Sequence, residues 1–201
     1  MTWIQVIPPE QARGPLKVFY DAAARQTGHV PEIVRAMSSA PQTLHAALGL
    51  YQATVLSATS HSRGVRELLA VVVSNLNGCD HCRRAHQADL RRALETDWFH
   101  LTFTSVEQGR RVSPSPDQMD EFARQAALDW RQLSLRPEPQ ALAEWAEQMT
   151  LRPADCNEKR IINLRLLGIS DASIHEALQV IAYFNYINRI ASALGVESAP
   201  V

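Results

Sequence analysis

The reactive side chains of this chain gather in one short stretch. It holds Cys79 and Cys82 as a C-x-x-C pair, the histidines His81 and His86, and Glu67 ahead of them at the start of an apolar run. A thiolate is the nucleophilic form of cysteine, and an oxidised sulfur can condense with a thiol one turn away to form a disulfide. In a chain of this kind, the pair therefore indicates a redox role or a metal site.

A buried helix followed by a turn is expected to carry Glu67. Apolar residues recur at three- and four-residue steps from Leu68 to Leu76, which is typical of a buried helix. The residues 75–78, Asn-Leu-Asn-Gly, are turn formers and predict a break. Glu67 can reach the thiols only if the helices on either side of this turn fold back on each other.

A second helix should begin at or just after Cys79 and run to about Leu94. On it, Cys82 and His86 are four residues apart and share a face, so His86 is placed to take the Cys82 proton. Cys79 lies one turn before Cys82, within reach of a disulfide if the Cβ vectors agree. The N-terminus of this helix supplies partial positive charge to both sulfurs.

Zinc is the rival interpretation of the same residues. Cys79, Cys82, His81 and His86 are four ligands in number, as a structural zinc site requires. On one helix, however, Cys82 and His86 face one way while His81 points elsewhere, so one helix is poorly suited to close a tetrahedron. The redox interpretation is therefore preferred, with no metal and no organic cofactor required.

The composition favours a single soluble domain. Of the 201 residues, 46% are hydrophobic, and the formal net charge is −1, which gives no indication of nucleic acid or of an acidic membrane surface as a partner. The N-terminus resembles no secretory signal, and no apolar run approaches the length of a membrane span. A cytoplasmic location is expected, where three cysteines argue against a disulfide scaffold.

The fold class predicted from the periodicity is all-α. A single domain over 1–201 would comprise an N-terminal arm and short helices (1–40), the redox-site helices (41–96) and C-terminal helices (117–196). Helices are expected at 9–26, 32–37, 41–59, after Ser60 or Ser62, at 79–94, 116–132, 137–150, 157–167 with Asp155 as cap, and 171–194 with Ser170 as cap. The segment 98–116 is expected to be a loop or short helix packed on a partner subunit, and exposed aromatics such as Trp98 and Phe99 favour a homo-oligomer.

The motif gives this chain a resemblance to a known family. The pattern is similar to the active-site signature of the alkylhydroperoxidase D and carboxymuconolactone decarboxylase superfamily, in particular its peroxidase-related branch. It consists of Glu67, eleven intervening residues, Cys79-Asp80-His81-Cys82, three further residues and His86. The resemblance extends to Ile7-Pro8-Pro9, to Gly28-His29-Val30-Pro31, and to Phe184-Asn185-Tyr186-Ile187-Asn188-Arg189 followed by Ala193-Leu194-Gly195-Val196. It implies an AhpD-like helical fold in which a helix-turn-helix carries the C-x-x-C.

The resemblance also implies roles for the five residues. The sulfur of Cys82 would attack the hydroperoxide and Cys79 would resolve the product. Glu67 and His86 would form a proton relay, and His81 would line the site. The helix dipole alone favours Cys79 as the more acidic thiol, but a base within hydrogen-bond reach should outweigh a term of about 0.3–1 kcal/mol.

The expected function is a thiol-dependent peroxidase. A hydroperoxide, most readily an alkyl one, would oxidise the pair, and an external dithiol, for example a lipoyl or thioredoxin-type protein, would reduce it again. The chain is expected to form a dimer or a hexamer. Two alternatives remain open: a redox-sensing or binding protein of the same fold, and an enzyme like carboxymuconolactone decarboxylase, against which the C-x-x-C pair argues.

Overall fold

Helix α4, Arg63–Leu76, lies at the centre of the protein. The side chain of Ser62 accepts a hydrogen bond from the Val65 amide and so caps the helix. From Gly64 to Ser74 every residue is buried, because α5, α6, α7 and α9 all pack against this helix. Burying one leucine or valine contributes about 1.5–3 kcal/mol, so α4 is the main source of the core.

Helix α5, Asp80–Leu101, folds back along α4. This is the arrangement that Glu67 needs in order to approach the segment that carries the thiols. The turn between them includes Gly78, whose φ of +65° lies in the left-handed region that favours glycine. At the other end of the helix pair, a Cβ on Gly64 would come within 2.9 Å of side-chain atoms of Asp97 and Leu101. Glycine at this position therefore allows the two helices to approach closely.

The computed structural model describes residues 2–103, 106–107 and 110–197. Within these ranges the chain is helical apart from a hairpin of two-residue strands, which confirms the predicted all-α class. The remaining elements are η1 (Pro9–Gln11), α1 (Gly14–Thr27), α2 (Glu32–Ala36), α3 (Pro41–Tyr51), η2 (Gln52–Leu56), β1 (Val106–Glu107), β2 (Arg110–Arg111), α6 (Pro116–Asp129), η3 (Trp130–Gln132), α7 (Pro137–Leu151), η4 (Pro153–Asp155), α8 (Glu158–Leu166) and α9 (Asp171–Ala193).

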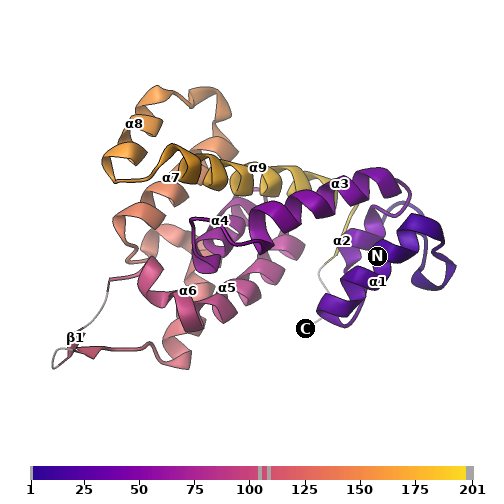
Figure 1. Ribbon diagram of the computed structural model, residues 1–201, viewed down its shortest axis with the longest axis horizontal. Coiled ribbons are helices and arrows are strands. Elements are labelled where there is room, and N and C mark those ends of the chain that lie inside the picture. Colours follow the sequence, from indigo (N-terminus) through magenta and orange to yellow (C-terminus); the bar gives the residue numbers. More distant parts are fainter. Residues whose placement is uncertain (1, 104–105, 108–109, 198–201) are drawn as a thin grey trace.

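The helices divide between two ends of an elongated molecule (Figure 1). Helices α6, α7 and α8 lie at one end, and α1 and α2 lie at the other, beside the end of the described chain. Helix α9 runs from the first end toward the second and crosses α4. The Trp3 amide donates to the Leu194 carbonyl at 2.9 Å, which joins the N-terminal arm to the C-terminal end of α9.

Four predicted helix boundaries are wrong for identifiable reasons. The first helix begins at Gly14, because Gly14 has a φ of +54° and precedes a proline, which disfavours helical backbone. The helix expected at 41–59 gives way to a π-helical turn, η2, and ends at Leu56. Helix α5 continues past Leu94 to the fully buried Leu101. The cap of α8 is Asn157, which accepts from the Lys159 amide, and not Asp155.

The segment 98–116 also differs from its prediction. Its first residues complete α5, and the ring of Trp98 packs on Phe122 of α6 with centroids 5.5 Å apart. Trp98 and Phe99 are half-buried in the chain itself, so they are not the exposed aromatics that a partner subunit would cover. Positions 104–105 and 108–109 lie outside the described residues. Strongly exposed apolar side chains occur instead at Phe103 and Leu166.

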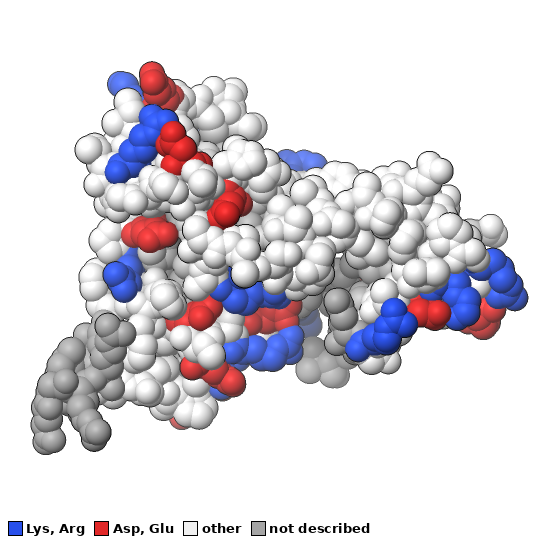
Figure 2. Space-filling model, in the orientation of Figure 1, with Lys and Arg blue, Asp and Glu red and all other residues white. Residues whose placement is uncertain are grey.

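The surface carries charges of both signs. On the face shown in Figure 2, lysine and arginine side chains alternate with aspartate and glutamate side chains, and an uncharged area covers α3 and the adjoining part of α9. Among the helices described, none combines the length and the apolar character that crossing a membrane requires.

Candidate redox site

The two cysteines of the C-x-x-C pair lie against each other at the start of α5. Cys79 is the N-cap residue and Cys82 belongs to the first turn. Their sulfur atoms are 3.0 Å apart, joined by a hydrogen bond, and both cysteines are free thiols. Cys79 is 4% exposed and Cys82 is 6% exposed. A small rotation of either side chain would bring the sulfurs to bonding distance.

The two thiols differ strongly in acidity. A hydrogen bond from Cys82 lowers the pKa of Cys79 to about 6, and the backbone of Cys82 and the Ser192 side chain act in the same direction against burial. The same contact with Cys79, together with burial, raises the pKa of Cys82, although Asn188 opposes this shift. At neutral pH the pair therefore holds one negative charge, centred on Cys79, and one proton, centred on Cys82.

Glu67 and His86 form an ion pair between α4 and α5. The Oε2 atom of Glu67 lies 2.7 Å from Nδ1 of His86, and Oε1 lies 2.6 Å from Nη2 of Arg63. Burial opposes the charged form of Glu67, but the charge and hydrogen bond of His86, with those of Arg63, lower its pKa. Burial likewise opposes the charged form of His86, yet Glu67 raises the pKa of the imidazole. Each member of the pair thus favours the charged form of the other.

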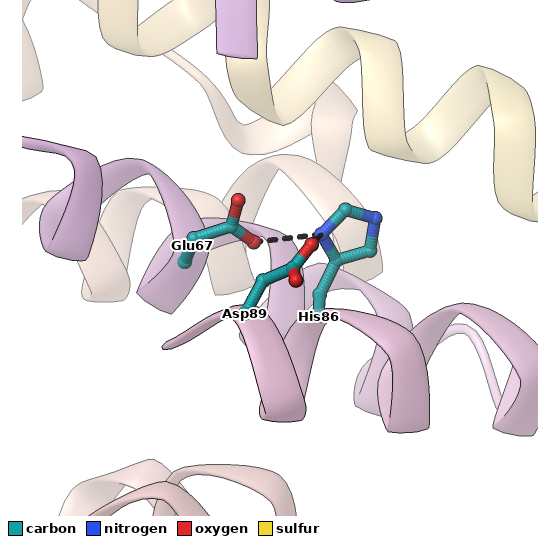
Figure 3. Close-up of side chains that lie close together, drawn as sticks. All are labelled: Glu67, His86 and Asp89. Carbon is teal, nitrogen blue, oxygen red and sulfur yellow. Dashed lines mark hydrogen bonds and ion pairs between the residues drawn. The ribbon is translucent and has the colours of Figure 1, made fainter. Parts of the chain in front are cut away.

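Asp89 also belongs to this cluster, although no motif in the sequence identified it. Figure 3 shows its carboxylate on the same side of the imidazole as that of Glu67, while the second ring nitrogen points away from both. The Oδ2 atom of Asp89 is 4.0 Å from Nδ1 of His86 and 4.0 Å from Nη2 of Arg63. Burial, and then the charge of Glu67, raises the pKa of Asp89.

These three side chains are the one group in the described part of the chain whose spacing would suit a metal ion. The ligand atoms of Glu67, His86 and Asp89 lie within 4.8 Å of one another. The guanidinium of Arg63 already contacts Glu67, however, so a cation is present where a metal would be needed to balance the carboxylate. Neither cysteine belongs to this group, and the zinc set considered from the sequence is not assembled among the described residues.

The other predicted site residue, His81, lies apart from the ion pair. Its Nδ1 atom is 3.1 Å from the carbonyl oxygen of Glu197, to which it donates because a carbonyl can only accept. Burial lowers the pKa of His81. Within the described residues, no hydrogen bond joins His86 to either sulfur, and its Nδ1 faces Glu67. The helix-helix contact thus brings Glu67 and His86 together, while His81 contacts the C-terminal segment.

A buried amide network supports the turn before Cys79. Asn188 on α9 is fully buried, donates to the Ser74 hydroxyl at 3.1 Å and accepts from the Asn77 amide at 3.1 Å. Asn77 also donates to Asn185 at 3.2 Å. Asn185 and Asn188 both lie in the segment 184–189 that carries the family resemblance. A buried amide needs hydrogen-bond partners, so an asparagine on the apolar face of this helix is a signal of such a network.

An apolar cover completes the site. The two cysteines and Ala191 of α9 form a small hydrophobic cluster, against which Ile33 of α2 and Val196 pack. A surface groove lined by Pro15, Phe19 and His45 lies elsewhere and includes neither cysteine. Ile33 and Val196 thus contribute to the burial of the two sulfurs.

This combination defines an all-helical protein with a buried dithiol beside a carboxylate–histidine ion pair. Residues 41–97, which span α3 to most of α5, match the model of the Carboxymuconolactone decarboxylase family. Over this segment the chain is similar to that family, which agrees with the resemblance noted from the C-x-x-C motif. Among curated proteins, none matches the sequence.

Solved structures show the same fold over almost the whole chain. An uncharacterized peroxidase-related protein from Ralstonia eutropha, described as an alkylhydroperoxidase AhpD core, has a TM-score of 0.80 at 20% identity, covering 98% of this chain and 92% of that one. A peroxidase-related protein from Silicibacter has a TM-score of 0.75 at 23% identity, covering 98% and 88%. The debrominase Bmp8 has a TM-score of 0.70 at 15% identity, covering 98% and 92%.

Proposed function

We propose that this protein is a thiol-dependent peroxidase that reduces alkyl hydroperoxides through Cys79 and Cys82. The observation that carries the proposal is the 3.0 Å contact between the two reduced sulfurs. Two thiols this close together can give up two electrons to an oxidant by forming a disulfide. The fold shared with peroxidase-related proteins supports the same conclusion.

In the first step, Cys82 attacks the hydroperoxide. Its proton passes across the sulfur-sulfur contact to the Cys79 thiolate, and the resulting Cys82 thiolate bonds to the terminal peroxide oxygen. The oxygen-oxygen bond breaks, and the alkoxide leaves as an alcohol after it takes a proton. The imidazolium of His86, held charged by Glu67, supplies this proton. Cys82 is now a sulfenic acid, oxidised by two electrons.

In the second step, Cys79 resolves the sulfenic acid. The Cys79 thiol returns its proton to the neutral His86, and its thiolate attacks the sulfur of Cys82. The sulfur-oxygen bond breaks, and the departing hydroxide is released as water with a proton from solvent or from the relay. The sum is one hydroperoxide and two thiols converted to one alcohol, one water and one disulfide.

An external dithiol then restores the pair. Thiol-disulfide exchange with a lipoyl or thioredoxin-type protein would return both sulfurs to the reduced form at the expense of its own dithiol. We propose that the protein acts in the cytoplasm as a homo-oligomer. His81 would line the path to the sulfurs, because it lies in the same turn of α5 as Cys82.

A peroxide titration of the reduced, metal-free protein tests the proposal. Free thiols are counted before and after, and the products are mapped by mass spectrometry, in the wild type and in Cys82→Ser. The expected result is the loss of two thiols as a Cys79–Cys82 disulfide in the wild type and no peroxide-dependent change in Cys82→Ser. Repeated turnover with a dithiol donor distinguishes an enzyme from a redox sensor. Survival of both wild-type thiols in excess peroxide would overturn the proposal.

Reductive debromination is a second candidate, favoured by one observation. The debrominase Bmp8 shares the fold, and a variant of it is known in complex with 2,3,4-tribromopyrrole. Such a reaction replaces carbon-bound bromine with hydrogen and consumes the same two electrons, so the dithiol would again become a disulfide. Bromide release from 2,3,4-tribromopyrrole by the reduced protein, without any reaction with hydroperoxides, would favour this candidate over the peroxidase.

A further inference from the structure

We propose that Ile33 and Val196 form a selectivity cap over the dithiol, which admits uncharged, apolar molecules and excludes charged ones. This inference rests on the proposed peroxidase function, for which the selectivity becomes a preference for hydroperoxides with an apolar organic group. The two residues come from opposite ends of the chain, and the C-x-x-C motif contains neither of them.

The cap is defined by its contacts. Ile33 and Val196 are the partly buried apolar side chains that pack against Cys79, Cys82 and Ala191. The cysteines are almost completely buried although Cys79 stands at the N-cap of α5 and Cys82 in its first turn. An incoming molecule must therefore displace these two side chains or slide between them.

Each half of the cap is held in place by its own hydrogen bonds. Ser38, just after the α2 helix that carries Ile33, accepts from the Ile7 amide at 2.8 Å. Val196 donates from its amide to the Ala191 carbonyl at 2.9 Å. The next residue, Glu197, accepts from Nδ1 of His81 at 3.1 Å, which ties the C-terminal segment to α5. The Val196 half of the cap is thus joined to the helix that bears the sulfurs.

The selectivity follows from desolvation. A charged or strongly hydrated molecule entering between Ile33 and Val196 would lose water contacts that two hydrocarbon side chains cannot replace. An apolar organic group is stabilised by the same contact, because its surface is removed from water. The charge on Cys79 adds repulsion against anions. Because substrate and cap are both apolar, the cap lowers the barrier for one class of molecule and raises it for the other.

The test compares two thiol reagents, neutral N-ethylmaleimide and the anionic disulfide 5,5′-dithiobis(2-nitrobenzoate), on reduced full-length protein. Cys156 is exposed and would react with both reagents, so every variant carries Cys156→Ser. Ile33→Ser and Val196→Ser are expected to raise the rate with the anionic reagent by about tenfold or more relative to the neutral one. Ile162→Ser on α8 makes the same change at a half-exposed residue remote from the dithiol and should leave the ratio unchanged.

The same variants are then compared with cumene hydroperoxide and hydrogen peroxide. The cap variants should lose preference for cumene hydroperoxide, whereas Ile162→Ser should keep it. An unchanged reagent ratio in both cap variants, with the far-ultraviolet circular dichroism of the wild type, overturns the cap. A changed reagent ratio in a protein that reacts with neither hydroperoxide supports the cap and refutes the peroxidase function, so the two failures are distinguishable.

Discussion

Glu67 and His86, nineteen positions apart in the chain, meet as a buried ion pair in which a carboxylate oxygen and Nδ1 are 2.7 Å apart. Glu67 has no exposed surface, and it lies on α4 while His86 lies on α5. A charge buried in this way is tolerated only when it is paired and hydrogen-bonded. The pair therefore links the stability of the two central helices to the protonation of the residue proposed as the proton donor.

The first prediction concerns Glu67→Gln. Removing the carboxylate leaves His86 without its counter-charge and should lower the pKa of His86, which NMR titration of the imidazole measures directly. The free energy of unfolding should fall by about 1–3 kcal/mol, since a buried charge-assisted hydrogen bond is lost. Glu121→Gln is the matched control, because Glu121 pairs with Arg124 on the surface and should change neither quantity.

The same variant should reveal a pH window. The pKa of Glu67 is lowered in the folded protein, so its contribution is present above about pH 4.3 and is lost as pH falls through the folded value. The pKa of His86 is raised, so its contribution is present below about pH 6.5 and is lost as pH rises through the folded value. The stability difference between wild type and Glu67→Gln should thus be largest between these values and shrink on either side.

The second prediction concerns the charge on the dithiol. Because the pKa of Cys79 is lowered to about 6, the ultraviolet absorbance of thiolate should rise with a midpoint near pH 6 in the reduced protein. The change should disappear in Cys79→Ser, and its midpoint should move to higher pH in Cys82→Ala, which loses the hydrogen bond to the thiolate. If Cys79→Ser abolishes the reaction with peroxide and Cys82→Ser preserves it as a trapped sulfenic acid, the attacking sulfur is Cys79.

The third prediction concerns the amide network at the turn. Asn188→Ala leaves the Ser74 hydroxyl and the Asn77 amide without the partner that they share inside the protein. The free energy of unfolding should fall by about 1–3 kcal/mol, as denaturant titration would show. Asn163→Ala makes the same change on the exposed surface of α8 and should be within about 0.5 kcal/mol of the wild type. Equal effects of the two substitutions would contradict a structural role for the network.

Much of this architecture was predictable because its causes are local. Apolar periodicity identified α4, the Asn-rich turn before Gly78 was recognisable, and C-x-x-C spacing places two sulfurs on one helix turn by geometry alone. The same reasoning failed where one residue overrides a periodic pattern, as Gly14 does before Pro15. This backbone restriction delays to Gly14 the start of a helix that the side-chain pattern alone would begin at Pro9.

The rest of the site depends on contacts between distant segments. Ile33 and Val196 lie far apart in the chain, yet both pack against the cluster of Cys79, Cys82 and Ala191, and no spacing in the sequence indicates this. Asp89 follows His86 by three positions, as many surface residues follow one another on a helix, and gains importance only because Glu67 approaches from α4. Long-range packing, rather than residue type, decides which side chains join the five that the motif identified.

The fourth prediction tests whether Asp89 acts on His86. The carboxylate of Asp89 favours the imidazolium, and Asp89→Asn removes this charge, so the pKa of His86 should fall. The fall should be smaller than in Glu67→Gln, because Asp89 is 4.0 Å from Nδ1 and Glu67 is 2.7 Å away. Arg63 and Arg92 also face Asp89 and partly balance its charge. NMR titration of His86 in both variants shows which substitution lowers its pKa more.

The pH dependence of the reaction rate should shift in the same direction as the pKa of His86. If His86 donates the proton, the limb of the pH-rate profile on which activity falls with rising pH should move to lower pH in Asp89→Asn, since the imidazolium is lost earlier. Asp89→Glu keeps the charge and should restore the wild-type profile, whereas a purely structural role would change the rate at every pH alike. Asp120→Asn is the control, because Asp120 pairs with Arg91 on the outer side of α5. A profile unmoved by Asp89→Asn, with the pKa of His86 also unmoved, would show that the relay consists of Glu67 and His86 alone.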